Sequence, residues 1–210
     1  MAEKLTENAI MKALDWAYEH AINGIPIPGV LTAEQLAQSY MRGSGDLRDK
    51  ANSLIRWQNT KATTTGFLTG LGGIITMPIS VPADLAVVWY IQIRMIAAIA
   101  YMGGYDLRDD KVKTLVYVCL CGNGAKDILK EFGIALGTKL TQSAIKSISG
   151  QVIVKINQKV GFRFVTKFGE KGLINFGRAV PLVGGLIGGT FDGVSTNIIG
   201  NIARETFIPR

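Results

Sequence analysis

The sequence predicts an all-α fold with one compact domain over residues 1–210. Apolar residues recur at three- and four-residue intervals through most of the chain, which is the period of a helix with one buried face. No segment alternates like a strand with comparable strength; residues 151–156 come closest and still fit a helix better. A chain of 210 residues can bury a sizeable core, so a single domain is expected.

The expected centre of this domain is a stretch from Lys61 to Tyr105 that carries almost no charge. Pro78 and Pro82 interrupt it, because proline lacks a backbone N–H and disfavours helix in the residue before it. We therefore predict a helical hairpin with a first arm, a bend at Met77–Val81 and a second arm over Ala83–Met102.

Glycines at four-residue spacing mark the first arm and the carboxyl-terminal helix. Each glycine costs about 1 kcal/mol relative to alanine inside a helix, so a run of them indicates a packing requirement. In a soluble bundle the glycines would allow two helices to cross closely; in a membrane they would mediate helix association in a pore or inserted hairpin. The predicted helix-packing residues are Gly66, Gly70, Gly73, Gly185, Gly189 and Gly193.

Amphipathic helices in residues 1–45 are expected to accompany a core formed by residues 46–210. Thr32 and Gln35 predict a capping box, and Asp46 and Asp106 are the predicted N-caps of two later helices. Besides the hairpin and the carboxyl-terminal helix, helices are predicted at 5–21, 32–40, 47–57, 106–120, 125–140 and 152–171, with a turn at 123–124.

The net charge of +7 lies in one segment, residues 139–178, which has eight Lys or Arg residues and a single acid, Glu170. Five of these cations follow one another at four-residue steps, which drift by only about 40° per turn around a helix. An apolar ridge at 152, 156, 160, 164 and 168 lies beside them, as in helices that bind membrane interfaces. The basic stripe consists of Lys155, Lys159, Arg163, Lys167 and Lys171.

Three interpretations of the basic stripe stay open: a solvated face, a contact with anionic lipid, and a contact with nucleic acid. Polybasic segments gain about 1 kcal/mol per Lys or Arg at an anionic membrane. Nucleic acid is the least favoured partner, since no DNA- or RNA-binding motif accompanies the stripe.

Asp84, Arg94 and Asp192 interrupt apolar segments. One interpretation is a helix cap for Asp84 and an ion pair or exposed edge for the other two. The other is a buried polar cluster between the glycine-rich helices, because ionisable groups in apolar helices are costly unless paired. Arg94 near the middle of the second arm also argues against a permanent membrane span, although the arm is long enough for one.

The sequence offers little material for catalysis. His20 is the single histidine, Ser44 lacks the G-x-S-x-G context, and residues 122–126 lack the spacing of a phosphate-binding loop. Cys119 and Cys121 have no zinc-ligand partners and are interpreted as buried reduced thiols. We expect no cofactor and no metal site; an uncharacterised hydrolase-like enzyme using one of the two aspartates above is kept as an alternative.

Several blocks together resemble the EcsC protein family: TGFLTGLGGIITMPISVPADL, IQIRMIAAIAYMGGYDL, INQKVGFR, AVPLVGGLIGGTFD and NIIGNIARETF. The resemblance covers residue 57 to the carboxyl end and implies an all-helical cytoplasmic bacterial protein. The family takes its name from a gene beside those of an ABC transporter, so the resemblance also implies a connection with transport or secretion. It brings no catalytic residues.

These observations predict a non-enzymatic cytoplasmic protein, peripheral at the inner face of the cell membrane. Its partners would be the anionic membrane surface and an ABC transporter or other membrane protein. The absence of a secretory apolar region in residues 1–22 agrees with this location. The main alternative is a membrane-inserting or pore-forming effector whose hairpin leaves the bundle.

Overall fold

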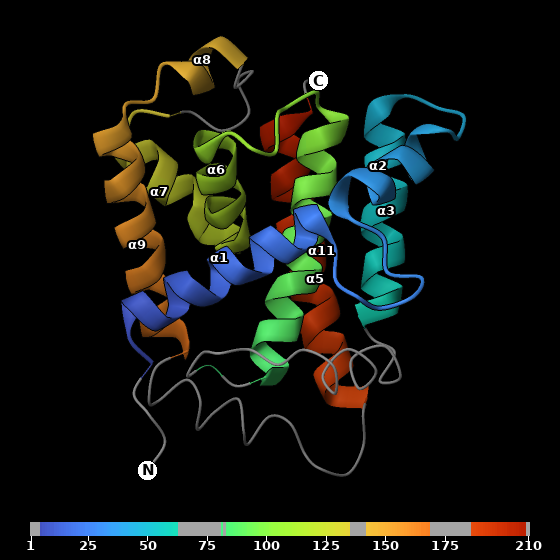
Figure 1. Ribbon diagram of the computed structural model, residues 1–210, viewed down its shortest axis with the longest axis horizontal. Helices are drawn as coiled ribbons and strands as arrows, with labels where there is room; N and C mark the ends of the chain where they lie inside the picture. Colours follow the sequence, from blue (N-terminus) through green and yellow to red (C-terminus); the bar gives the residue numbers. More distant parts are fainter. Residues whose placement is uncertain (1–4, 63–80, 82, 135–141, 169–185, 209–210) are drawn as a thin grey trace.

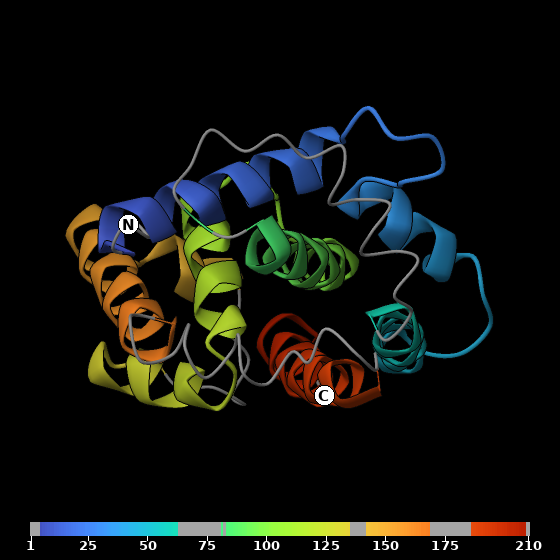
Figure 2. The same ribbon diagram turned by 90° about the horizontal axis from the view of Figure 1, so that it is seen from below.

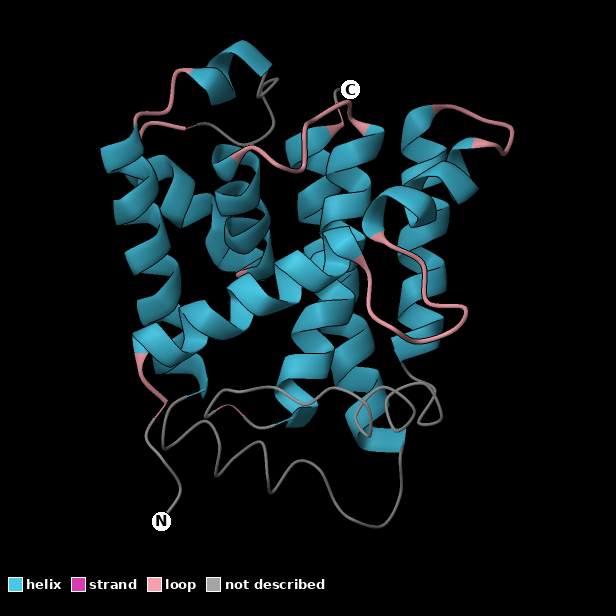
Figure 3. Ribbon diagram, in the orientation of Figure 1, coloured by secondary structure: helices cyan, strands magenta, loops and turns pink. Residues whose placement is uncertain are grey.

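The computed structural model describes residues 5–62, 81, 83–134, 142–168 and 186–208, which are helices and connecting loops without a strand (Figures 1 and 3). The predicted all-α class is therefore confirmed. The helices are α1 (Glu7–Asn23), α2 (Ala33–Met41), α3 (Leu47–Ala62), α5 (Ala83–Met102), α6 (Asp110–Leu120), the 3-10 helix η1 (Gly122–Gly124), α7 (Ala125–Glu131), α8 (Gln142–Lys146), α9 (Gly150–Phe168) and α11 (Leu186–Phe207).

Helix α5 lies at the centre of the molecule. Seen from below in Figure 2, it is flanked by α1 on one side and α11 on the other, with α6 and the α2–α3 pair at its two remaining sides. Leu85–Met102 is the one helical window among the described residues that is long and apolar enough to cross a membrane, yet 89% of it is buried inside the protein. A helix that is apolar all round fits this central position.

The predicted hairpin is described only in its second arm. This arm has the predicted bounds, Ala83–Met102. The first arm and most of the bend fall in residues 63–80, which lie outside the described part of the chain. The hairpin as a whole therefore stays a prediction.

Local capping of α2 and α3 follows the sequence closely. The Thr32 hydroxyl accepts a hydrogen bond from the Gln35 amide at 3.2 Å, and the Gln35 side chain accepts one from the Thr32 amide at 3.0 Å, which completes the predicted capping box. Asp46 accepts a hydrogen bond from the Asp49 amide at 2.7 Å at the start of α3. These bonds satisfy amides that the first helical turn leaves without intrahelical partners.

The start of α6 corrects one prediction. Asp109, not Asp106, is the N-cap, and its carboxylate accepts a hydrogen bond from the Lys111 amide at 2.8 Å. The Asp106 side chain instead accepts one from the Arg108 amide at 2.9 Å, within the preceding turn. Both aspartates have the right chemistry for an N-cap. Residues 106–109 form a turn, closed by a hydrogen bond from the Asp109 amide to the Asp106 carbonyl, so the helix begins only after Asp109.

The end of α7 corrects a second prediction, that of a helix over 125–140. Helix α7 ends at Glu131, and Gly133 adopts a left-handed conformation with φ of 72°. The Gly133 amide donates to the Lys130 carbonyl, and the Ile134 amide donates to the Leu129 carbonyl. This is the Schellman arrangement that glycine favours after a helix, because it has no Cβ to strain.

Helix α11 packs against α3 and α5. Ile55 of α3 lies so close to Gly200 that a Cβ at position 200 would be 2.7 Å from the Ile55 Cγ1 atom. On the α5 side, the buried Gln92 side chain donates a hydrogen bond to the Thr196 hydroxyl at 3.2 Å. The close approach of α11 to the core therefore depends on a glycine that the sequence analysis did not select.

The predicted glycine contacts are not described by the structure. Gly66, Gly70, Gly73 and Gly185 lie outside the described residues. Gly189 and Gly193 belong to α11, but the description of side-chain surroundings in this helix begins at residue 195. The helix-packing role of these six glycines stays a prediction.

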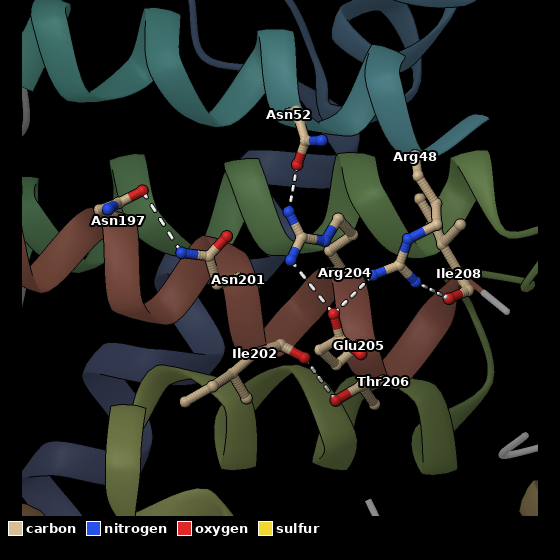
Figure 4. A network of polar contacts seen from close by, with 9 residues as sticks. All are labelled: Arg48, Asn52, Asn197, Asn201, Ile202, Arg204, Glu205, Thr206 and Ile208. Atoms are coloured by element: carbon tan, nitrogen blue, oxygen red, sulfur yellow. Dashed lines mark hydrogen bonds and ion pairs between the residues drawn. The ribbon is translucent and has the colours of Figure 1, made fainter. Parts of the chain in front are cut away.

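A polar network joins α3 to the last turns of α11 (Figure 4). The Glu205 carboxylate accepts hydrogen bonds from Arg48 at 2.5 Å and from Arg204 at 3.1 Å, while Arg48 also donates to the Ile208 carbonyl. Arg204 in turn donates to Asn52 of α3. Burial by itself would raise the pKa of Glu205, but the hydrogen bonds from the two arginines lower it overall.

Candidate functional site

Helix α9, which carries the basic stripe, lies at one end of the molecule (Figures 1 and 2). It packs against α1, α6 and α7. Its inner face buries Ile156, Val160 and Phe164, and the Phe164 ring meets the Trp89 ring of α5 edge-on at 5.2 Å between centroids. Gly161 lies where α1 crosses, with Glu7 and Met11 as its nearest neighbours.

This packing corrects the interpretation of the apolar ridge on α9. The residues that the sequence analysis placed beside the stripe as an interfacial ridge include Ile156, Val160 and Phe164, which face the protein core. Their four-residue spacing is the same for a core-facing ridge and for a lipid-facing one. The ridge therefore holds α9 on the domain and is not available to a partner.

The outer face of α9 presents two other apolar side chains, Val154 and Phe162, each 56% exposed. On an ideal helix Phe162 lies about 20° from Lys155 and about 80° from Val154 around the axis, so all three share one broad face. Sequence reasoning missed both apolar residues. They could have been found as the apolar positions left over once 156, 160 and 164 are assigned to the core.

The four described members of the stripe have different surroundings. Lys155 is exposed and has no ion-pair partner within the part of the chain that the structure describes. Lys159 forms an ion pair with Glu131 of α7 at 3.0 Å, with both side chains about half exposed. The Arg163 guanidinium lies against Gly124 of η1. Lys167 lies over the Phe168 ring at 5.1 Å.

The stripe therefore winds from the outer face of α9 toward the neighbouring helices, as a four-residue step requires. Burial lowers the pKa of Lys167, and the neighbouring Arg163 lowers it further, while Cys121 opposes this effect. Burial raises the pKa of Cys121 to about 12 against the attraction of Arg163 and Lys167. Lys171 lies outside the described residues.

The predicted polar cluster is described only at Arg94. This side chain is 4% exposed. Its Nη1 atom donates a hydrogen bond to the Leu31 carbonyl at 3.3 Å, and its guanidinium carbon lies 5.4 Å from the centre of the Tyr90 ring. Asp84 lies in the first turn of α5 and Asp192 in α11, but their side chains are outside the description, so the cluster stays a prediction.

The histidine and the two cysteines considered for catalysis make packing and hydrogen-bond contacts within the protein. The His20 Nδ1 atom contacts the Trp16 carbonyl oxygen at 2.8 Å, and the two rings stack at 4.2 Å. Cys119 is buried, Cys121 is partly buried, and both are free thiols. Within the described residues, no group of three or more His, Cys, Asp or Glu side chains is arranged to hold a metal ion.

The described chain is thus a helical domain with a buried apolar helix at its centre and a cationic helix at one edge. The model of the EcsC protein family matches residues 32–210. The chain therefore belongs to the EcsC protein family, as the sequence motifs indicate. Comparison with curated proteins and with solved structures gives no match.

Proposed function

We propose that this protein is a non-enzymatic, peripheral membrane protein that docks on anionic lipid through the outer face of α9. The single observation that supports this most directly is the exposed Phe162 side chain on the side of α9 that also carries the exposed Lys155 two turns earlier. An exposed aromatic residue flanked by cations matches the chemistry of a membrane interface, where the ring enters the acyl boundary and the cations meet phosphate.

The charge of α9 gives further support. The helix has four cations and no acid in residues 150–168. Lys155 lies two turns before Phe162 on the same side of α9 and has no ion-pair partner among the described residues, whereas Lys159, one turn before Phe162, would exchange between Glu131 and lipid. Arg163 and Lys167 are also exposed, although the Arg163 guanidinium lies against Gly124 and Lys167 lies over the Phe168 ring, and both add to the positive potential of this face.

Docking by α9 requires no unfolding of the core. The apolar helix α5 is buried by its neighbours, so its length does not call for insertion into the bilayer. We propose that the docked protein lies at the inner face of the cytoplasmic membrane and is accessory to an ABC transporter or a secretion-related assembly. Capture of partners from native membranes, with an α9 variant as the comparison, tests this second step.

Flotation with vesicles tests the docking. Wild-type protein should float with vesicles containing phosphatidylserine in low salt, and should dissociate as salt screens the cations. Phe162→Ser and Lys155→Glu should each weaken binding, since burying an aromatic side chain contributes about 1.5–3 kcal/mol and a cation about 1 kcal/mol.

Matched control variants lie at the opposite end of the molecule. Met41→Ser removes an apolar side chain that is 40% exposed, and Lys50→Glu makes the same charge change as Lys155→Glu on α3. Both should float like wild type. Equal loss in the control and α9 variants, or flotation that ignores lipid charge, would refute the proposal. Dye leakage from the vesicles would favour the membrane-inserting alternative.

A further inference from the structure

A second feature lies at the other end of the molecule, where α2, α3 and α5 meet the loop before α2 (Figure 1). A cavity of about 290 Å³ opens there. Its walls include Leu31, Tyr40, Trp57, Gln58 and Arg94. The volume is close to the lower end of the range for small-molecule sites in proteins.

The wall of this cavity contains a buried charge without a counter-ion. Arg94 is 4% exposed; its Nη1 atom donates a hydrogen bond to the Leu31 carbonyl, and its guanidinium lies beside the Tyr90 ring. The Nε atom has no partner. No carboxylate in the described part of the chain pairs with this guanidinium. Such a charge is costly to bury, and an oxyanion can pair with two N–H groups of one guanidinium at once.

A second polar atom in the cavity wall also lacks a partner. The Gln58 side-chain oxygen is buried without a donor, and Gln58 lines the same cavity. Buried polar atoms in folded proteins are almost always satisfied, so a donor and an acceptor that both lack partners in one cavity indicate a missing partner that accepts from Arg94 and donates to Gln58.

The mouth of the cavity has a different character. Leu31 is 39% exposed and Trp57 is 50% exposed, and both line the cavity. Their exposed apolar surfaces lie at the entrance to a wall that holds a cation. A ligand that satisfies both would combine an oxyanion with a short apolar part.

We propose that this cavity binds a small organic anion, with its carboxylate or phosphate group paired to Arg94 and its apolar part against Trp57 and Leu31. A carboxylate would accept hydrogen bonds from Arg94, and a phosphate monoanion would in addition donate its remaining O–H to the Gln58 side-chain oxygen. This site is independent of the membrane-docking face on α9, which lies at the opposite end of the long axis (Figures 1 and 2).

The Trp57 side chain provides the assay. The chain has three tryptophans, and the indole N–H signal of Trp57 is identified in an NMR spectrum by its loss in Trp57→Phe. Butyrate and butyl phosphate are the probes; inorganic phosphate lacks the apolar part, and butanol lacks the charge. We expect a saturable shift of the Trp57 signal with the two organic anions, a weaker one with inorganic phosphate, and none with butanol or with chloride at equal ionic strength.

Arg94→Met is the matched variant, because it keeps the length of the side chain and removes the charge. It should weaken binding of the organic anions by about tenfold or more, since hydrogen bonds to charged groups contribute strongly. If this variant does not fold, the comparison of butyrate with butanol on the wild-type protein decides the question. Equal shifts with both, or none with any anion, would overturn the proposal.

A further experiment distinguishes a membrane lipid from a soluble molecule as the source of the carboxylate. Vesicles containing oleate offer the carboxylate in a membrane, whereas butyrate offers it in solution. A response to dissolved butyrate that Arg94→Met abolishes supports a soluble ligand. A response to oleate vesicles alone, also abolished by Arg94→Met but not by Phe162→Ser, supports the same site with a lipid as ligand.

Discussion

The guanidinium of Arg163 occupies the space that a side chain at Gly124 would fill. Gly124 belongs to the short 3-10 helix between α6 and α7, and it is buried there. Because glycine has no Cβ, the third cation of the basic stripe can lie against the protein. This contact explains why a stripe that is regular in the sequence is not uniform on the surface.

Replacing Gly124 should therefore release this cation. In Gly124→Ala the new Cβ would displace the far end of a flexible side chain, so the free energy of unfolding should change by less than about 1 kcal/mol. If α9 docks on lipid, vesicle affinity should rise by up to about fivefold, since a cation near an anionic surface contributes about 1 kcal/mol. Urea unfolding and flotation measure the two effects. A stability loss above about 2 kcal/mol would show that Arg163 cannot move.

Gly161→Ala should stabilise the protein. A Cβ at this position of α9 would lie 3.5 Å from Glu7 and Met11, which is an ordinary contact distance. The gain in helix propensity is then unopposed and amounts to roughly 0.5–1 kcal/mol. Thermal or urea unfolding measures it. A loss of stability would mean that α1 and α9 lie closer than these distances.

Gly200→Ala, in contrast, should destabilise the protein. The new Cβ would overlap the buried Ile55 side chain, and such overpacking costs typically about 1–3 kcal/mol. In an Ile55→Ala background the same change should cost much less, because the overlapping atoms are gone. Additive effects of the two substitutions in a double-mutant cycle would contradict the contact.

The Glu205 network should make stability depend on pH. Its folded pKa is lowered, so its contribution is present above the unfolded pKa of about 4.3 and is lost as pH falls through the folded pKa. Glu205→Gln should therefore melt at a lower temperature than wild type at pH 7, and the difference should shrink in acid. Glu131→Gln, which removes an exposed ion pair with Lys159, is the control and should change little at either pH. A gap that persists in acid would exclude the charged network as its cause.

The two thiols should be unreactive in the folded protein. Burial raises the pKa of Cys119 and of Cys121 to about 12, so almost no thiolate exists at neutral pH. A thiol reagent at pH 7.5 should label neither residue until denaturant is added and both afterwards. Rapid labelling of Cys121 under native conditions would show that the contact between α6 and α9 opens.

Much of the fold follows from short-range chemistry that the sequence displays. The Thr32–Gln35 capping box and the bounds of α5 agree with the prediction because each depends on residues within one turn or on a continuous apolar run. Asp106 and Asp109 are equally suitable caps by residue type. The structure distinguishes them, because Asp106 accepts a hydrogen bond inside the turn and Asp109 accepts one at the start of the helix. The prediction at 125–140 gave Gly133 too little weight as a helix end.

The candidate site was harder to predict, since periodicity alone does not distinguish a face toward the core from one toward a partner. Ile156, Val160 and Phe164 have the spacing expected of either. Only their contacts with α1, α5 and α6 assign them to the core and leave Phe162 outside. Likewise, the basic spacing is visible in the sequence, but the partners of Lys159 and Arg163 come from α7 and η1.

The sequence by itself determined the helical class, the central apolar helix, the single cationic segment and the family, because these depend on composition, period and motif order. Tertiary structure decided which side of α9 faces outward and which glycine of α11 allows that helix to approach α3 closely. It also decided that Arg94 is buried in a cavity wall with an unpaired Nε atom. Those properties depend on contacts between residues far apart in the chain, and such contacts have no local signature.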